Sequence, residues 1–214
     1  MYPQILSKIV TDTRYFTLNR DCYNQKNLFF LHLSTNQLNQ LFQIACKNGV
    51  TEGVKLLLSY QSVDPSVDAF DYAFDCASFY GNPEIIKLLL SDQRFYPSSY
   101  ALNRAFHCAS FNSNLEIVKL LLSDQRYDPN ASCNIQYASK EGYYEVVKLL
   151  LSDPRVDPCG NENQAIRFAS FNGHLEIVKL LLSDPRMEGL LQVSELNCAI
   201  RGASRSFIKY FIIT

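Results

Sequence analysis

The chain has 214 residues, 47% of them apolar, which is enough for one compact domain or one elongated array. Its 20 basic and 21 acidic residues leave a net charge of −1, so no general electrostatic attraction to nucleic acid or to a charged membrane is expected. The 7 cysteines, an odd number without a CxxC pair, exclude a complete disulfide framework and fit no zinc-ligand pattern.

No targeting or membrane-spanning segment is expected. The first ten residues, MYPQILSKIV, lack the long apolar stretch of a signal peptide. The longest apolar runs, such as NLFFLHL at 27–33, are far too short to cross a bilayer. With the cysteines interpreted as reduced thiols, these features indicate a soluble intracellular protein in a reducing compartment.

Residues 1–37 are predicted to form an N-terminal region with a capping helix and an irregular insertion. The segment YPQILSKIVTDTRYF at 2–16 aligns without a gap with NPEIIKLLLSDQRFY at 82–96, which is typical of the helices predicted below. We therefore expect residues 2–12 to form a lone helix that covers the front of the helices that follow. Residues 16–37 match no repeat, and they fit either a short strand pair or an irregular loop.

Residues 38–214 are predicted to contain about six copies of one unit. The copies align on an alanine, here called the anchor alanine, which recurs after 32, 32, 29, 31 and 30 residues. The anchor alanines are Ala45, Ala77, Ala109, Ala138, Ala169 and, more weakly, Ala199. The tenth residue after each anchor is a lysine: Lys55, Lys87, Lys119, Lys148, Lys179 and Lys209. A motif that recurs at a fixed step indicates a repeat architecture, in which the last copy is expected to be a C-terminal cap.

Each unit is predicted to contain two helices. In the first, an apolar residue stands three positions before the anchor, as Phe74 does before Ala77, which marks one face of a short helix. The second, such as EIVKLLLS at 116–123, is apolar on most of its surface and polar along one edge. Asn82 and Pro83 between them are typical of an N-cap and the first helical position. One unit cannot bury both helices alone, so we expect an all-α solenoid of stacked helix-turn-helix units.

These repeats resemble the ankyrin repeat over roughly residues 38–214. The unit length, the A[SC]xxGx turn, the EIVKLLLS second helix and the following loop carry the resemblance. The family's usual TPLH opening of the first helix is absent, and RAFH (104–107) and QAIR (164–167) stand in its place. The loop sequence SDPRVDP is most similar to loops in the divergent ankyrin arrays of giant amoebal DNA viruses. That similarity implies a viral protein in the cytoplasm of the producing or infected host cell.

The resemblance implies a non-catalytic scaffold or adaptor, which binds a protein partner through a concave groove and the loop tips. The alternative is a structural, self-assembling component, such as a virion protein. It would form homo-oligomers through FIKYFIIT at 207–214, a helix whose outer side is aromatic and apolar. A third interpretation is that this segment only closes the core. The fold does not name the partner.

The acidic and basic residues of the loops have a structural explanation. In four repeats an aspartate stands two positions before an arginine, which fits ion pairs and turn caps that brace each loop. The pairs are Asp92 and Arg94, Asp124 and Arg126, Asp153 and Arg155, and Asp184 and Arg186. The segment GVTEGVK at 49–55 lacks the GK[ST] ending of a phosphate-binding loop, so no nucleotide cofactor is expected.

The histidines and cysteines predict no catalytic or metal site. His107 and His174 occupy repeat positions, and neither has a second ligand at metal-binding spacing. The position before the anchor is expected to hold packed thiols: Cys76, Cys108 and Cys198. We therefore expect no enzyme, no cofactor and no metal. An enzyme would need a site in the unassigned 16–37 segment, which contains Asp21, Cys22 and His32.

A candidate binding surface lies at the position two residues after the anchor. At about 100° per residue, this position points away from the buried face of the first helix. It is aromatic or basic in every unit: Phe79, Phe111 and Phe171, with Lys47, Lys140 and Arg201. We expect this stripe to bind an extended or helical segment of another protein, with an acidic contribution from that segment. Polar contacts at the rim are expected from Tyr80, Asn112 and Asn172. The alternative is that each phenylalanine folds back onto the next repeat.

Overall fold

The computed structural model describes residues 34–59, 67–130 and 133–187, and within these ranges every regular element is a helix. The chain divides into two compact units, Met1–Asp124 and Gln125–Thr214, which are described separately. The capping helix predicted for 2–12 and the last repeat around Ala199 lie outside the described residues. The first described helix begins at Thr35, inside the region assigned to the N-terminal segment, and the domain boundary at 37/38 stays a prediction.

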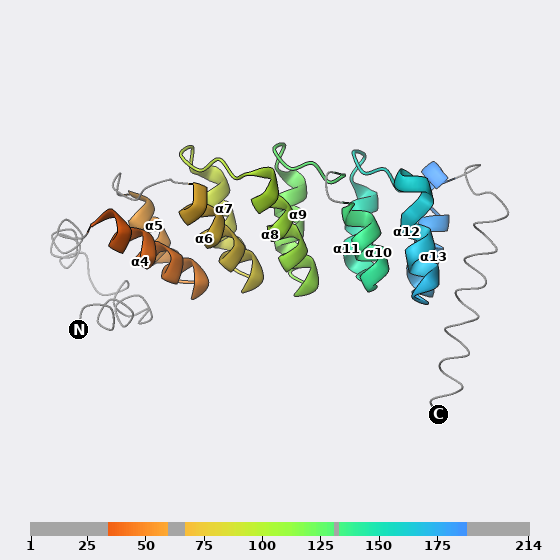
Figure 1. The fold of residues 1–214 in the computed structure, drawn as a ribbon, viewed down its shortest axis with the longest axis horizontal. Coiled ribbons are helices and arrows are strands. Elements are labelled where there is room, and N and C mark those ends of the chain that lie inside the picture. The colour runs from red at the N-terminus through yellow and green to blue at the C-terminus, as the bar shows by residue number, and fades with distance from the viewer. Residues whose placement is uncertain (1–33, 60–66, 131–132, 188–214) are drawn as a thin grey trace, which may run out of the picture. The chain divides into compact units, whose positions relative to one another are not determined.

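The first unit contains three helical hairpins in two layers (Figure 1). Its first helices pack side by side: α4 (Thr35–Lys47), α6 (Val67–Phe79) and α8 (Ser99–Phe111). Its second helices form the other layer: α5 (Thr51–Ser59), α7 (Pro83–Ser91) and α9 (Leu115–Ser123). Each first helix also packs against the second helix of its own repeat. This is the stacking that the repeat spacing predicts.

The second unit repeats this arrangement with two hairpins. Its first helices, α10 (Asn134–Glu141) and α12 (Gly160–Phe171), pack against each other, as do its second helices, α11 (Tyr144–Ser152) and α13 (Leu175–Leu182). A short 3-10 helix, η1 (Pro185–Met187), follows α13. Residues 161–163 of α12 have left-handed φ values of 55°, 57° and 58°, so the regular part of that helix begins after them.

Each unit has its core between the helix layers. All five described anchor alanines are 0% exposed, and this small side chain allows neighbouring first helices to approach closely. In the first unit the aromatic residues form a continuous chain of ring contacts. The ring centroids of Phe42 and Phe70 are 4.9 Å apart, and Phe95 lies 5.1 Å from Phe70 and 5.3 Å from Phe74. These contacts join α4, α6 and the loop after α7, so neighbouring repeats share one core.

The turn between the two helices of a repeat connects to the next repeat. Gly81 has a φ of +73°, and a Cβ built on it would lie 2.8 Å from Oδ1 of Asn114, so a glycine is required there for two reasons. The side-chain nitrogen of Asn114 donates to the Ser78 carbonyl, 3.2 Å away in the preceding repeat. In the second unit Nε2 of His174 lies 2.9 Å from the Lys140 carbonyl in the equivalent place.

Asn82 occupies the N-cap position of α7, as predicted, but its side chain bonds to the preceding repeat and not to its own helix. Pro83 is the first helical residue of α7, as predicted, but the Asn82 side chain makes no capping hydrogen bond. Its amide nitrogen instead donates to the Cys46 carbonyl of the preceding repeat, at 3.2 Å. The carbonyls at the end of a first helix have no partner within that helix, so a side chain from the next repeat satisfies one of them.

The aspartate–arginine pairs of the loops are confirmed at three described places. Arginine Nη2 and aspartate Oδ2 are 2.6 Å apart in Asp92–Arg94, Asp153–Arg155 and Asp184–Arg186. The hydrogen bonds from the arginines hold the pKa of all three carboxyls below the ordinary value. Each arginine also reaches a main-chain carbonyl of the preceding repeat; Nη2 of Arg94, for example, lies 2.6 Å from the Leu58 oxygen. One side chain therefore stabilises its own loop and joins two repeats.

Candidate functional site

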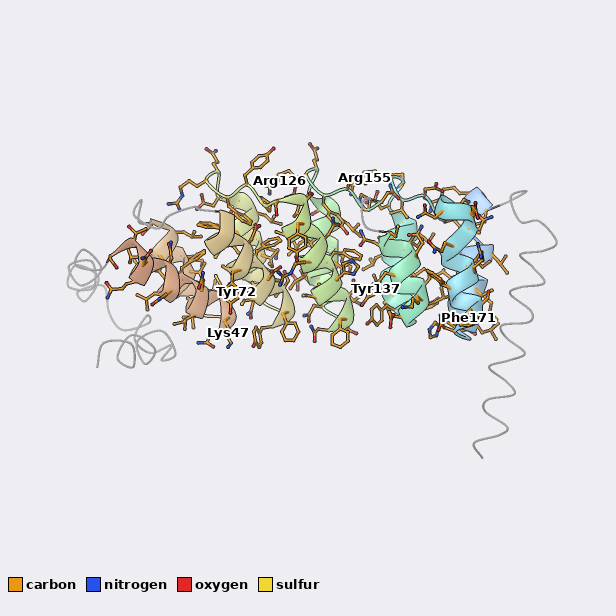
Figure 2. The ribbon with its side chains drawn as sticks, viewed as in Figure 1. Lys47, Tyr72, Arg126, Tyr137, Arg155 and Phe171 are labelled. Carbon is orange, nitrogen blue, oxygen red and sulfur yellow. The ribbon has the colours of Figure 1, made fainter. Side chains whose placement is uncertain are left out.

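The first helices of the first unit present one row of side chains away from the second helices. Relative to the anchor, the row takes positions −5, −2 and +2, which are three or four residues apart and therefore share one helix face. We call it the first-helix face. On α6 it consists of Tyr72, Asp75 and Phe79, and on α8 of Arg104, His107 and Phe111. Lys47 of α4 holds the +2 position and lies at the lower edge of this unit in Figure 2.

The predicted aromatic positions are exposed. Phe79 is 48% exposed, Phe111 65% and Phe171 67%, so these rings do not fold back into the core. Lys47 and Lys140 are exposed as well, whereas Arg201 lies outside the described residues. In the second unit Phe171 is at the lower edge of Figure 2, opposite the loop edge that holds Arg155.

The predicted rim residues divide into two kinds. Tyr80 packs edge-on against Phe79, with the ring centroids 5.2 Å apart, and Nζ of Lys47 lies 5.8 Å from the centre of the Tyr80 ring. These three side chains form one aromatic and basic patch across two repeats. Asn112 and Asn172 have a different role, because each side-chain nitrogen donates to a carbonyl 2.9 Å away at the end of its own helix.

Sequence reasoning missed two exposed tyrosines on α6 and α8. Tyr72 is 52% exposed and Tyr100 66%, and both stand on the same helix faces as the predicted phenylalanines, seven and eleven residues before them. Extending the predicted stripe by two or three turns along α6 and α8 identifies them. The hydroxyl of Tyr72 is also hydrogen-bonded to the Cys76 thiol.

Asp75 of α6 and Arg104 of α8 form an ion pair between neighbouring repeats on this face. Nη2 of Arg104 lies 2.8 Å from Oδ2 of Asp75; the aspartate side chain is 10% exposed and the arginine side chain 49%. The second carboxyl oxygen, Oδ1, is buried without a hydrogen-bond partner. Burial raises the pKa of Asp75 to about 6, against the opposing effect of Arg104. The guanidinium carbon lies 5.5 Å from the centre of the Tyr100 ring.

The thiols near the anchor are packed and free. Cys46 and Cys76 are buried and Cys108 is half-buried, and burial raises the pKa of each thiol. Cys198 lies outside the described residues. Within 34–59, 67–130 and 133–187, no three His, Cys, Asp or Glu side chains come together as a metal site requires. In the same ranges no helix is long and apolar enough to cross a bilayer.

The first-helix face of the second unit differs from that of the first, because its basic side chains lie close to acidic neighbours. Lys140 of α10 is paired with the adjacent Glu141 at 3.3 Å, and Arg167 of α12 lies 3.9 Å from Glu162. At the −2 position of α10, Gln136 is only 5% exposed. Phe171 is therefore the main exposed aromatic side chain on this face of the second unit's described residues.

Stacked hairpins with an exposed first-helix face define the class: an all-α repeat solenoid. A family model of ankyrin repeats in three copies matches residues 42–134, 105–188 and 135–212, and the chain belongs to the ankyrin-repeat family. Ankyrin repeats are in general protein–protein interaction modules without catalytic activity. No curated protein matches the chain.

Proposed function

We propose that this protein is a scaffold or adaptor that binds a segment of another protein across the first-helix faces and the loop tips. The observation that carries the proposal is the exposure of phenylalanine at one repeat position in three separate repeats, between 48% and 67%. Exposed aromatic rings at equivalent places favour a surface that a partner covers, because such rings are energetically unfavourable in water.

The contacts of the site residues support a division of roles. Phe79 and Phe111 are the proposed apolar anchors in the first unit and Phe171 in the second. Lys47 and Tyr80, which contact each other, contribute a positive charge and an aromatic rim. Lys140 and Arg201 are the proposed basic members further along the chain, with Asn112 and Asn172 beside the phenylalanines.

The loop sequence SDPRVDP supports a further part of the proposal, that the chain is one of the ankyrin arrays of giant amoebal viruses. In that case it acts in the cytoplasm of the producing or infected host cell. Among the described residues, the cysteines at 46, 76, 108, 133 and 159 form no disulfide bond, which is compatible with a reducing compartment.

The test replaces Phe79, Phe111 and Phe171 together with serine and compares wild type and variant as baits in quantitative affinity capture. Because the three rings are exposed, the variant is expected to keep its melting temperature within a few degrees. It is also expected to lose at least one protein that the wild type enriches. Truncation of exposed aromatic anchors typically weakens binding by tenfold or more, at roughly 2 kcal/mol each.

The matched control changes two exposed apolar residues of the second helices, Tyr144 of α11 and Leu175 of α13, to serine. This control is expected to capture the same proteins as the wild type. A triple variant that unfolds, or one that captures the same proteins as the wild type, contradicts the proposed surface.

A further inference from the structure

We propose that Arg104 binds a carboxylate side chain of the partner segment and that Asp75 competes with the partner for it. The segment recognised by the first unit is then acidic, with an Asp or Glu beside an apolar or aromatic residue. This inference rests on the proposed function and specifies the chemistry of its partner.

Arg104 has hydrogen-bonding capacity left for a ligand. A guanidinium carries five N–H donors in a planar fork, which suits two-point binding of a carboxylate. Among the described residues, Arg104 pairs with Asp75 at 2.8 Å and contacts Tyr100, and its side chain is 49% exposed. The group is therefore held in place by its neighbours while much of it faces solvent.

Asp75 is a weak permanent partner for this arginine. Its side chain is 10% exposed, only Oδ2 meets the guanidinium, and Oδ1 is buried without a hydrogen-bond partner. A buried carboxylate with one unsatisfied oxygen is unfavourable in its charged form. Protonation removes that cost and weakens the hold on Arg104, which leaves the guanidinium for another carboxylate.

The surroundings of Arg104 complement an acidic and apolar segment. Among the side chains described on α4, α6 and α8, the only acids are Asp71 and Asp75. Asp75 is buried, and Asp71, which is only partly exposed, accepts a hydrogen bond from the Ser98 hydroxyl at 2.9 Å. Among the same described side chains, the exposed charges are Lys47 and Arg104. Exposed rings flank them on the same face: Tyr72, Phe79, Tyr100 and Phe111. Charge complementarity therefore favours an acidic partner.

Several ionisable groups face Asp75 from the helices around it. The charge of Asp71 on α6 raises the pKa of Asp75, and the charge of Arg104 on α8 lowers it. The charge of Asp75 in turn raises the pKa of the Cys76 and Cys108 thiols. The positive charge of Lys47 on α4 lowers the pKa of the Cys76 thiol. The ionisable residues of α7, Glu84 and Lys87, pair with each other at 2.9 Å.

This arrangement gives binding a defined pH dependence. Burial raises the pKa of Asp75 to about 6, so Asp75 gains a proton between pH 7.5 and 5.5. A partner Glu, with an ordinary pKa of about 4.3, stays ionised. Affinity for the acidic segment is therefore expected to rise as the pH falls. His107, whose pKa is lowered by burial, would add a positive charge in the same direction, so the Asp75 contribution needs its own control.

The probe is a displayed library of random twelve-residue peptides, selected on the full chain at pH 7.5 and low salt. Enriched peptides are expected to place Asp or Glu next to an aromatic or branched apolar residue. Binding of one enriched peptide is then measured for the wild type, Asp75→Asn and the double variant Asp75→Asn/Arg104→Gln. The double variant avoids leaving Asp75 buried as an unpaired charge, which would destabilise the fold.

Asp75→Asn is expected to bind the peptide about threefold or more tightly at pH 7.5, because Arg104 loses its competitor. The double variant is expected to bind at least about tenfold more weakly than Asp75→Asn, the effect of losing a charge-assisted hydrogen bond. The wild type should bind a few-fold more tightly at pH 5.5 than at pH 7.5. Asp75→Asn should show a smaller increase, which measures the contribution of His107 alone. The matched control is Lys119→Gln, an exposed basic residue on the second helix α9, outside the first-helix face, which should bind as the wild type does.

The outcomes separate this inference from the proposed function. Enriched peptides that bind the double variant as tightly as Asp75→Asn overturn the role of Arg104, whereas the protein-binding role stands. A pH dependence that persists unchanged in Asp75→Asn overturns the competition. A library that yields no peptide above background contradicts both proposals.

Discussion

At the scale of single residues, two aspartates of this chain, Asp92 and Asp75, have opposite electrostatic environments. Asp92 in the loop accepts hydrogen bonds from Arg94, which lowers its pKa and favours the charged form. Asp75 on α6 is more deeply buried and keeps one oxygen without a partner, which raises its pKa to about 6. The loop aspartate therefore stabilises the fold above about pH 4, and the helix aspartate destabilises it near neutral pH.

The first stability prediction concerns Asp75→Asn. The folded pKa of about 6 exceeds the ordinary 3.8, so the free energy of unfolding falls as the pH rises from about 4 to 6. Above that window the full cost of the buried charge is present. Asp75→Asn should therefore raise the free energy of unfolding by about 1–3 kcal/mol at pH 7.5 and have little effect near pH 4. Urea unfolding at several pH values measures both effects.

A decrease in stability at pH 7.5 would contradict this prediction. In that case the ion pair with Arg104 would contribute more than the burial of Asp75 costs. Asp92→Asn is the matched comparison, because its lowered pKa predicts the opposite sign: a loss of stability at pH 7.5 that disappears as the pH falls below the folded pKa.

At the scale of elements, the loops join repeats through their arginines. Arg186 illustrates this: its Nη2 lies 2.6 Å from the Leu151 carbonyl at the end of α11, and its Nη1 lies 2.9 Å from the Val156 carbonyl. Asp184 holds the guanidinium in this orientation. The last carbonyls of a helix lack partners within the helix, so this arginine caps the second helix of the preceding repeat.

Arg186→Lys should therefore destabilise the protein although it keeps the charge. A lysine has no planar fork and cannot donate to both carbonyls and to Asp184 in the same geometry. We expect a loss of about 1–3 kcal/mol in the free energy of unfolding, measured by thermal or urea denaturation. Arg167→Lys changes an arginine whose only described ion pair is 3.9 Å long, and it should cost less than about 0.5 kcal/mol. Equal effects of the two substitutions would contradict the capping role.

At the scale of the whole molecule, the choice lies between a binding module and a self-assembling component. The hypothesis of self-assembly depends on the segment 207–214, which lies outside the described residues. Size-exclusion chromatography with light scattering measures the mass of the full chain directly. A single species near 24.5 kDa is expected for the proposed adaptor. A dimer or larger assembly that dissociates when Phe207 and Tyr210 become serine would instead support the structural alternative.

What the sequence by itself determined is the part of the structure that depends on short separations along the chain. The anchor alanines, the buried phenylalanines three positions before them and the loop pairs such as Asp92–Arg94 all lie within a few residues of one another. Helical geometry or a tight turn fixes such contacts within one repeat. Because the unit recurs, the prediction of two helices for one unit also holds for every described copy. Stacked copies of such a unit form the predicted solenoid.

Only the tertiary structure decided the contacts between repeats. The Asn82 side chain meets the Cys46 carbonyl, Arg94 meets the Leu58 carbonyl, and Asp75 meets Arg104, over separations of 36, 36 and 29 residues. Which residues meet depends on the distance and rotation between stacked hairpins, which no local pattern encodes. The same stacking leaves the phenylalanine rings exposed and buries Asp75, because exposure depends on how closely the next helix packs.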